Sequence, residues 1–229
     1  MPVDRAARYA TTAYVIVGLW WAWLSGQPAP AWLASIWFGA VAAVGAYMPG
    51  PANQVSLGRA YLAAPALVYA LHHDYGLLAL CVALAGLSDM VDGTIARRFA
   101  TPSQVGGGLD PVVDGLFMGA LVLGLALGGT FPVWLALVVV ARYLLPAVAG
   151  ALLLALGRRP ELRHTLTGQV STTLILVLVG GVCLLRGLNQ DASGLLTGAE
   201  VVIPLATVAT YVHLFFATFR RPAAASAAG

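Results

Sequence analysis

The sequence predicts an all-α polytopic membrane protein, and its composition, its regularly broken apolar runs and its charge distribution support this. Of the 229 residues, 60% are hydrophobic and only 9% are charged, and the mean hydropathy is +0.86. A soluble domain carries about 25% charged residues, so a soluble fold is excluded. The net charge of +3 is small and gives no reason to expect a nucleic-acid partner.

Apolar runs of the length that a membrane span needs, about 20 residues, occur repeatedly along the chain. We expect eight spans, roughly at 10–25, 31–48, 57–73, 75–95, 109–129, 131–156, 166–187 and 197–219. Breaks rich in Gly and Pro separate several of them, such as "GQPAPA" (26–31), "PGPANQ" (49–54) and "GGTFP" (128–132). The first run is short and rich in Trp, and we interpret it as a retained helix rather than a cleaved signal peptide.

The arginines predict the orientation of these spans. All twelve basic residues are arginine, and eight spans place ten of them on one side of the membrane: Arg5, Arg8, Arg59, Arg97, Arg98, Arg158, Arg159, Arg163, Arg220 and Arg221. Arg186 falls on the other side and Arg142 inside a span. Because basic loops stay in the cytoplasm, we expect a protein of the cell membrane with both termini and the aspartate-bearing helix ends on the cytoplasmic side. Cys81 and Cys183 lie in apolar runs and are interpreted as core residues.

Four of the nine acidic residues fall within 26 positions, at the ends of two neighbouring spans. Asp89 and Asp92 are three residues apart, and Asp110 and Asp114 are four apart, so each pair shares one helix face. Carboxylates crowded at membrane depth repel one another, and a divalent cation relieves this repulsion. Oxygen-only ligands favour Mg²⁺ or Mn²⁺ over zinc.

Glycine and arginine accompany these acidic residues. Gly93 directly follows Asp92, and a glycine triplet at 106–108 precedes Asp110. Glycine allows the backbone to approach a bulky diphosphate, and the guanidinium of Arg97 suits phosphate oxygens. Together these residues predict a metal-bridged phosphate site.

The complete stretch reads Asp89-x2-Asp92-Gly93-x2-Ala96-Arg97-x8-Gly106-x3-Asp110-x3-Asp114. It resembles the signature of the CDP-alcohol phosphatidyltransferase family at every fixed position, and "PANQVSLGR" (51–59) resembles the start of that family's first core helix. The resemblance implies an N-terminal two-helix extension at 1–49, a six-helix catalytic core at 50–219 and a disordered cytoplasmic tail at 220–229. The extension lies outside the resemblance and has no function that the sequence suggests.

The resemblance also implies an enzyme that transfers a phosphatidyl group from CDP-diacylglycerol to an alcohol, releases CMP, and works as a homodimer with two Mg²⁺ or Mn²⁺ ions. Asp89, Asp92 and Asp110 would bind one ion, and Asp89, Asp110 and Asp114 the other, with Asp114 also the general base. The residues that would contact the CDP-lipid are Gly93, Arg97, Ser103, Gly106 and Asn53.

The acceptor alcohol is less sharply indicated. "LDPVVD" (109–114) resembles the branch that makes phosphatidylglycerophosphate or cardiolipin. That branch usually has a lysine where this chain has Gly115, and a lysine-containing stretch where this chain has "GQVST" (168–172). Arg142, Arg158 and Arg163 are candidates for supplying the missing charge, although a buried arginine such as Arg142 can equally be a structural hydrogen-bond donor.

Three alternatives stay open at the level of sequence. The acceptor can be another polar alcohol, such as inositol phosphate or serine. The chain can be a family member that has lost activity, given the changes on its acceptor side. A cation transporter is the alternative from a different class, but transporter acids tend to lie near the membrane midplane in repeated halves, whereas these aspartates cluster at one end.

Overall fold

The computed structural model describes residues 5–99, 106–155 and 166–219, and in these ranges all regular structure is α-helical. The described chain forms eight helices: α1 (Arg5–Leu24), α2 (Ala31–Gly45), α3 (Pro51–Leu71), α4 (Tyr75–Phe99), α5 (Gly106–Leu127), α6 (Val133–Ala155), α7 (Leu166–Gly187) and α8 (Ser193–Phe219). The predicted fold class is confirmed. Ser103, Arg158, Arg163 and the expected tail at 220–229 lie outside the described residues.

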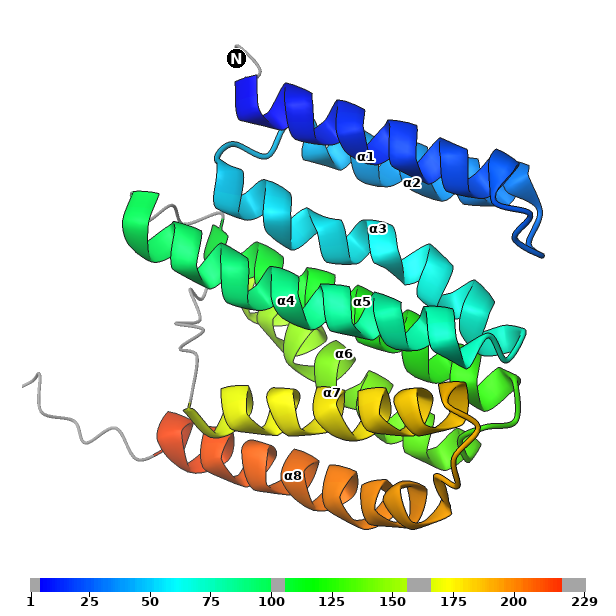
Figure 1. Cartoon of the computed structure of the whole chain (residues 1–229). Helices are drawn as coiled ribbons and strands as arrows, with labels where there is room; N and C mark the ends of the chain where they lie inside the picture. Colours follow the sequence, from blue (N-terminus) through cyan, green and yellow to red (C-terminus); the bar gives the residue numbers. More distant parts are fainter. Residues whose placement is uncertain (1–4, 100–105, 156–165, 220–229) are drawn as a thin grey trace, which may run out of the picture.

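Successive helices run in alternating directions, so that the start of α1 and the end of α8 are at the same end of the molecule (Figure 1). The hairpin of α1 and α2 packs on α3, and α3 packs against both α4 and α5. Further contacts join α4 to α7, α5 to α6, and α8 to both α6 and α7. The helix α3 therefore separates the N-terminal hairpin from the rest of the bundle.

Five helices extend beyond the spans expected from hydropathy, namely α1, α3, α4, α5 and α8. The extension is largest at the start of α3 and, among helix ends, occurs at α4. α3 begins at Pro51, six residues before the expected start, because proline is well tolerated at the first helical position, where its missing N–H is not needed. Gly50, directly before it, has a φ of +89°, a left-handed conformation that glycine adopts without a steric penalty. α4 continues to Phe99, so Asp89 lies ten residues before the helix end rather than about one turn before it.

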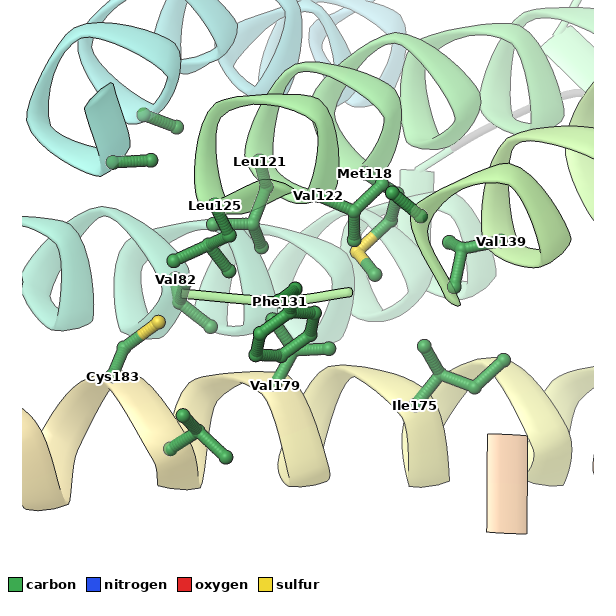
Figure 2. Close-up of a cluster of buried hydrophobic side chains, with 14 of the residues drawn as sticks. Val82, Met118, Leu121, Val122, Leu125, Phe131, Val139, Ile175, Val179 and Cys183 are labelled. Atoms are coloured by element: carbon green, nitrogen blue, oxygen red, sulfur yellow. The ribbon is translucent and has the colours of Figure 1, made fainter. Parts of the chain in front are cut away.

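The core of the last six helices is a cluster of apolar side chains to which each of the six contributes. Figure 2 shows Leu121 and Leu125 of α5 in one cluster with Val82 of α4 and with Val179 and Cys183 of α7. Apart from Val82, which is 5% exposed, these side chains have no exposed surface. Between membrane helices, close packing rather than transfer out of water stabilises the association, so the fit in this cluster holds the bundle together. Both cysteines are buried and free, as expected.

Large apolar side chains also face outward. Leu84 of α4, Leu137 of α6, Val177 of α7 and Leu205 of α8 are each between 45% and 65% exposed. Such surfaces suit contact with lipid rather than water. Gly168–Gly187 and Ser193–His213 are long and apolar enough to cross a membrane, and shorter apolar stretches occur in α2, α4, α5 and α6. The architecture is that of a polytopic membrane protein.

The N-terminal hairpin attaches to α3 through aromatic side chains. The rings of Tyr14 and Tyr61 stack with their centroids 4.5 Å apart, and Trp21 Nε1 donates a hydrogen bond to Tyr69 Oη at 2.6 Å. Trp37 Nε1 donates to the backbone oxygen of Ala60 at 2.9 Å. Stacking and hydrogen bonds of this kind fix geometry as well as adding stability, so the hairpin holds α3 in a defined position.

The helices α3 and α5 run in the same direction and meet through small residues. Gly124 and Gly128 of α5 lie against Ala70 of α3. Residues four apart share one helix face, and small residues on such a face allow two membrane helices to approach closely. This contact aligns the two helices along their whole length, including their first halves, where the candidate site lies.

Candidate functional site

Three helices bring charged side chains together at one end of the bundle. Nη1 of Arg59, on α3, lies 2.5 Å from Oδ1 of Asp89 on α4 and 2.8 Å from Oδ1 of Asp114 on α5. The Arg59 side chain is 4% exposed, that of Asp114 24% and that of Asp89 63%. The buried guanidinium of Arg59 thus pairs with two carboxylates, the half-buried one of Asp114 and the exposed one of Asp89.

The helical framework explains why these residues meet. Asp89 lies on α4 and Asp114 on α5, and both helices pack against α3 (Figure 1). Along the parallel pair α3 and α5, Arg59 lies 11 residues before Ala70, and Asp114 lies 10 residues before Gly124. At about 1.5 Å per residue, these nearly equal steps from the small-residue contact place Arg59 and Asp114 at the same level.

Arg59 is a site residue that the sequence interpretation missed. The sequence places Arg59 only among the arginines that mark the cytoplasmic side. The structure instead buries its side chain against two of the predicted metal ligands. The signal was present in the sequence, because Arg59 is followed at once by the apolar run "AYLAAPALVYAL" (60–71). Arg59 also falls inside the expected span 57–73, and an arginine within a span is a functional candidate by default.

The other two predicted acidic ligands are described only through their helical backbone. Asp92 follows Asp89 by three residues on α4, and Asp110 precedes Asp114 by four on α5. The expectation that each pair shares a helix face is consistent with this placement. Among the side chains that the structure describes, no third Asp, Glu, His or Cys joins Asp89 and Asp114 in one cluster.

The residues predicted to contact a CDP-lipid are spread over three places. Gly93 is half-buried on α4, and Gly106 is the first residue of α5, so the glycine triplet begins the helix rather than the preceding linker. Arg97 lies near the end of α4. Asn53, in the first turn of α3, donates a hydrogen bond from Nδ2 to the backbone oxygen of Pro49 at 2.7 Å, which supports the turn between α2 and α3.

Arg142 lies on α6 and connects three helices. Its side chain is buried, with Nη1 donating to Thr210 Oγ1 of α8 at 3.1 Å and Nη2 to the backbone oxygen of Gly168 of α7 at 3.2 Å. A third hydrogen bond reaches Thr172 Oγ1 at 3.3 Å. A structural role as a hydrogen-bond donor is therefore observed.

Arg142 also lies at the depth of the acidic pair. An added Cβ at Gly115, next to Asp114, would lie 3.1 Å from the Cβ of Tyr143, the neighbour of Arg142. Tyr143 thus fills the space beside Gly115. A side chain at position 115 would require this tyrosine to move, which gives a physical reason for the glycine.

The donor set of the site suits a hard cation. Two carboxylates from different helices converge on a single positively charged group, so the site already stabilises positive charge at this point. Carboxylate oxygens without sulfur or imidazole ligands match the preference of Mg²⁺ and Mn²⁺. The residues present therefore fit a divalent ion, and Asp89 and Asp114 are the two candidate ligands whose side chains the structure describes.

A second polar cluster lies at the opposite end of the bundle. A cavity of about 350 Å³ is lined by Tyr75, Arg186, Gln190, Asp191 and Ser193, among others. The guanidinium of Arg186 lies over the ring of Tyr75, 5.5 Å from its centroid. Hydrogen bonds from the backbone N–H and the hydroxyl of Ser193 lower the pKa of the Asp191 carboxyl, which is the usual effect of donors on a carboxylate at a helix start.

Comparison with known proteins identifies relatives along most of the chain. The sequence model of the CDP-alcohol phosphatidyltransferase family matches residues 51–219. A probable cardiolipin synthase (CMP-forming) of Drosophila melanogaster is 33% identical over 145 residues, which cover 56% of this chain and 45% of that protein. A CDP-diacylglycerol--glycerol-3-phosphate 3-phosphatidyltransferase of Bacillus subtilis is 28% identical over 138 residues, 60% of this chain and 66% of the relative.

A shorter match has higher identity. A cardiolipin synthase (CMP-forming) of Streptomyces coelicolor is 43% identical over 63 residues, which cover 28% of this chain and 29% of that protein. No solved structure matches the chain. The chain thus corresponds to less than two thirds of the length of each of these relatives.

Proposed function

The chain belongs to the CDP-alcohol phosphatidyltransferase family, and we propose that it transfers a phosphatidyl group from CDP-diacylglycerol to an alcohol and releases CMP. The observation that carries this proposal is the convergence of Asp89 and Asp114 within the matched region. These are the first and last aspartates of the signature, 25 residues apart in the sequence. Both carboxylates pair with the guanidinium of Arg59, which supports the proposal that the aspartates of the signature form one site.

In the proposed reaction, the hydroxyl oxygen of the acceptor attacks the phosphorus that carries the diacylglycerol. The bond between that phosphorus and the oxygen bridging to CMP breaks, and CMP leaves with the bridging oxygen. Asp114 accepts the hydroxyl proton, as a general base within hydrogen-bond reach of the nucleophile.

The metal ligands in this proposal are the four aspartates, Asp89, Asp92, Asp110 and Asp114. A pair of Mg²⁺ or Mn²⁺ ions would stabilise negative charge on the attacking and leaving oxygens. The protein holds two of these carboxylates on separate helices that α3 fixes relative to each other. The packing of α4 and α5 on α3 therefore fixes the distance between Asp89 and Asp114, the first and last aspartates of the signature.

For the nucleotide-lipid we propose contacts to Gly93, Arg97, Ser103, Gly106 and Asn53. Gly93, which has no side chain, leaves the surface of α4 open one residue after Asp92, and this allows a diphosphate to approach the backbone. Arg97 is four residues further along α4, one turn from Gly93. A guanidinium at that distance suits the phosphate oxygens that the metal ions leave unbound.

For the acceptor we propose the chemistry of phosphatidylglycerophosphate or cardiolipin synthesis, which the "LDPVVD" segment and the names of the relatives support. Both acceptors carry a phosphate and need positive charge close to Asp114. Arg142 lies at that depth, and Arg158 and Arg163 are the further candidates. Tyr143 lies close to position 115, which disfavours a large side chain there and supports a source of this charge on α6 or in the segment after it.

We further propose that the enzyme is a homodimer of the cell membrane with both termini and the active site facing the cytoplasm. The alternating directions of the eight described helices support placing the two ends of the chain on one side. Ten of the twelve arginines then lie on that side, as the distribution of basic residues across membranes requires.

The deciding experiment incubates the purified protein in lipid with CDP-diacylglycerol, Mn²⁺ and one acceptor at a time: glycerol 3-phosphate, phosphatidylglycerol, inositol phosphate or serine. CMP release is the readout, and the Asp114→Asn protein is the matched control. Release that depends on glycerol 3-phosphate or phosphatidylglycerol supports the proposal. Release with inositol phosphate or serine alone would assign another acceptor, and no release with any acceptor would contradict the proposed activity.

A further inference from the structure

Arg59 carries an inference that goes beyond the proposed roles of the aspartates. Its guanidinium contacts Asp89 and Asp114 through the same nitrogen, Nη1, at 2.5 and 2.8 Å. We propose that Arg59 is an internal counter-ion, which holds these two carboxylates together before divalent ions bind and competes with the ions for them. This inference rests on the proposed metal site and adds a positioning residue to it.

The first step of the argument concerns the cost of the acidic pair. Two carboxylates that converge without a cation between them repel each other, and α4 and α5 would be pushed apart at this point. A guanidinium that pairs with both removes the repulsion through charge-assisted hydrogen bonds. Arg59 thus allows the two helices to keep one arrangement whether or not metal is bound.

The second step concerns which partner can move. Arg59 is 4% exposed, whereas Asp89 is 63% exposed. Little packing restrains an exposed carboxylate, so its orientation depends on its ion pair with Arg59. Asp89 can therefore turn from Arg59 towards an incoming ion, while the arginine stays in place.

The third step concerns how Arg59 itself is fixed. Gln54, on the same helix, donates from Nε2 to the backbone oxygens of Gly45 and Met48 at 2.8 and 2.7 Å. Tyr14 Oη donates to the backbone oxygen of Gln54 at 3.1 Å, and Trp37 binds the oxygen of Ala60, next to Arg59. The N-terminal hairpin thereby holds α3 on both sides of Arg59, which gives the two extra helices a role in the site.

A purely structural ion pair makes a different prediction. A structural pair stabilises the protein equally with and without metal, and its loss weakens or leaves unchanged the binding of ions. A counter-ion stabilises mainly the metal-free protein, and its removal leaves the carboxylates more negative. Ion binding should then become tighter, because one positive charge no longer opposes the ion at short distance.

The test measures Mn²⁺ binding to the full-length protein in detergent by electron paramagnetic resonance, without substrate. The variants are Arg59→Met and Arg59→Gln, with Arg186→Met at the opposite end of the bundle as control. We expect Arg59→Met to bind Mn²⁺ about tenfold more tightly and Arg186→Met to bind it like the wild type. The thermal midpoint of Arg59→Met should fall in EDTA and recover with Mn²⁺.

An affinity in Arg59→Met that equals or falls below that of the wild type would overturn the inference and leave the metal site standing. Failure of the wild type to bind Mn²⁺ at all would overturn both the inference and the proposed metal dependence. If Arg59→Met does not fold, Arg59→Gln decides the question, because its amide also removes the charge but keeps hydrogen-bonding groups in the buried site. Tighter Mn²⁺ binding in that variant supports the counter-ion role, and unchanged or weaker binding contradicts it.

Discussion

Gly124 of α5 faces Ala70 of α3 so closely that an added Cβ at position 124 would lie 2.7 Å from the Cβ of Ala70. The same Cβ would lie 3.0 Å from the backbone oxygen of Leu67. Because backbone atoms cannot turn aside as a flexible side chain can, this contact sets the distance between the two helices. Those helices carry Arg59 and Asp114, so the small-residue contact also sets the geometry of the site.

The first prediction concerns this contact. Gly124→Ala should destabilise the protein by about 1–3 kcal/mol, as overpacking does in a well-packed interior. Gly119→Ala is the matched control on the same helix, because a Cβ there would meet nothing within 4 Å, and it should be neutral or stabilising by up to about 1 kcal/mol. Thermal unfolding in detergent measures both, and equal midpoints would show that α3 and α5 are not in close contact at Gly124.

The second prediction separates the proposed base from the proposed ligands. Asp114→Asn keeps one oxygen ligand but removes the basic carboxylate, so it should lower the rate of CMP release by roughly 10²–10⁴-fold with little loss of CDP-diacylglycerol binding. Asp89→Asn should weaken the binding of metal and of nucleotide-lipid together, because Asp89 is proposed to bridge both ions. Binding and turnover are measured side by side. An Asp114→Asn protein with most of its activity would place the base elsewhere.

The third prediction concerns the ions. Treatment with EDTA should abolish CMP release, and Mg²⁺ or Mn²⁺ should restore it, because converging carboxylates need cations to orient a diphosphate. The control is addition of Ca²⁺, whose longer bonds and higher coordination number fit such a site less well. Full turnover in excess EDTA would contradict the proposed site.

The fourth prediction concerns Arg142. If its charge serves a phosphate-bearing acceptor, Arg142→Met should raise the KM for that acceptor at least about tenfold, the loss of one hydrogen bond to a charged group, with the KM for CDP-diacylglycerol unchanged. Thr210→Val is the control, because it removes one hydrogen-bond acceptor of Arg142 and keeps the charge. Equal effects of the two substitutions would assign Arg142 to joining α6, α7 and α8 alone.

The fifth prediction concerns topology. Single cysteines at Val3 and Ser226 should be protected from a membrane-impermeant thiol reagent in intact cells, and one at Gln190 should react. Gln190 is exposed in the turn before α8, at the end of the bundle opposite the acidic site. The native Cys81 and Cys183 are 6% and 0% exposed, so they contribute little background. Labelling at Val3 or Ser226 from outside would reverse the proposed orientation.

The features that sequence predicted well are local. Helix number follows from the lengths of the apolar runs, and the pairs Asp89–Asp92 and Asp110–Asp114 follow from spacing within one helix. Hydropathy alone starts α3 too late, at residue 57, because the residues from Pro51 to Ser56 include polar ones and hydropathy ignores the preference of proline for a first helical turn. The resemblance of "PANQVSLGR" (51–59) to the start of a core helix agrees with the observed start at Pro51.

What the sequence did not predict depends on packing between helices. Arg59 is 30 residues from Asp89 and 55 from Asp114, and the three meet only because α3 lies between the hairpin and the pair α4 and α5. The partners of Arg142 are likewise 26 to 68 residues away. Spacing rules apply within an element, so contacts of this kind need the arrangement of helices in space.

The shortness of α2 has a consequence for the lipid around the protein. With 15 residues and a rise of about 1.5 Å per residue, α2 is about 22 Å long, whereas the hydrocarbon core of a bilayer is about 30 Å thick. Thinning of the bilayer beside it is one response to so short a helix. Gly45, the last residue of α2, contacts Gln54 and Leu57 of α3, just before Arg59. A leaflet thinned at this point would place lipid headgroups nearer to the depth of Asp89 and Asp114, so that the proposed lipid-borne diphosphate would reach the two carboxylates without leaving its bilayer.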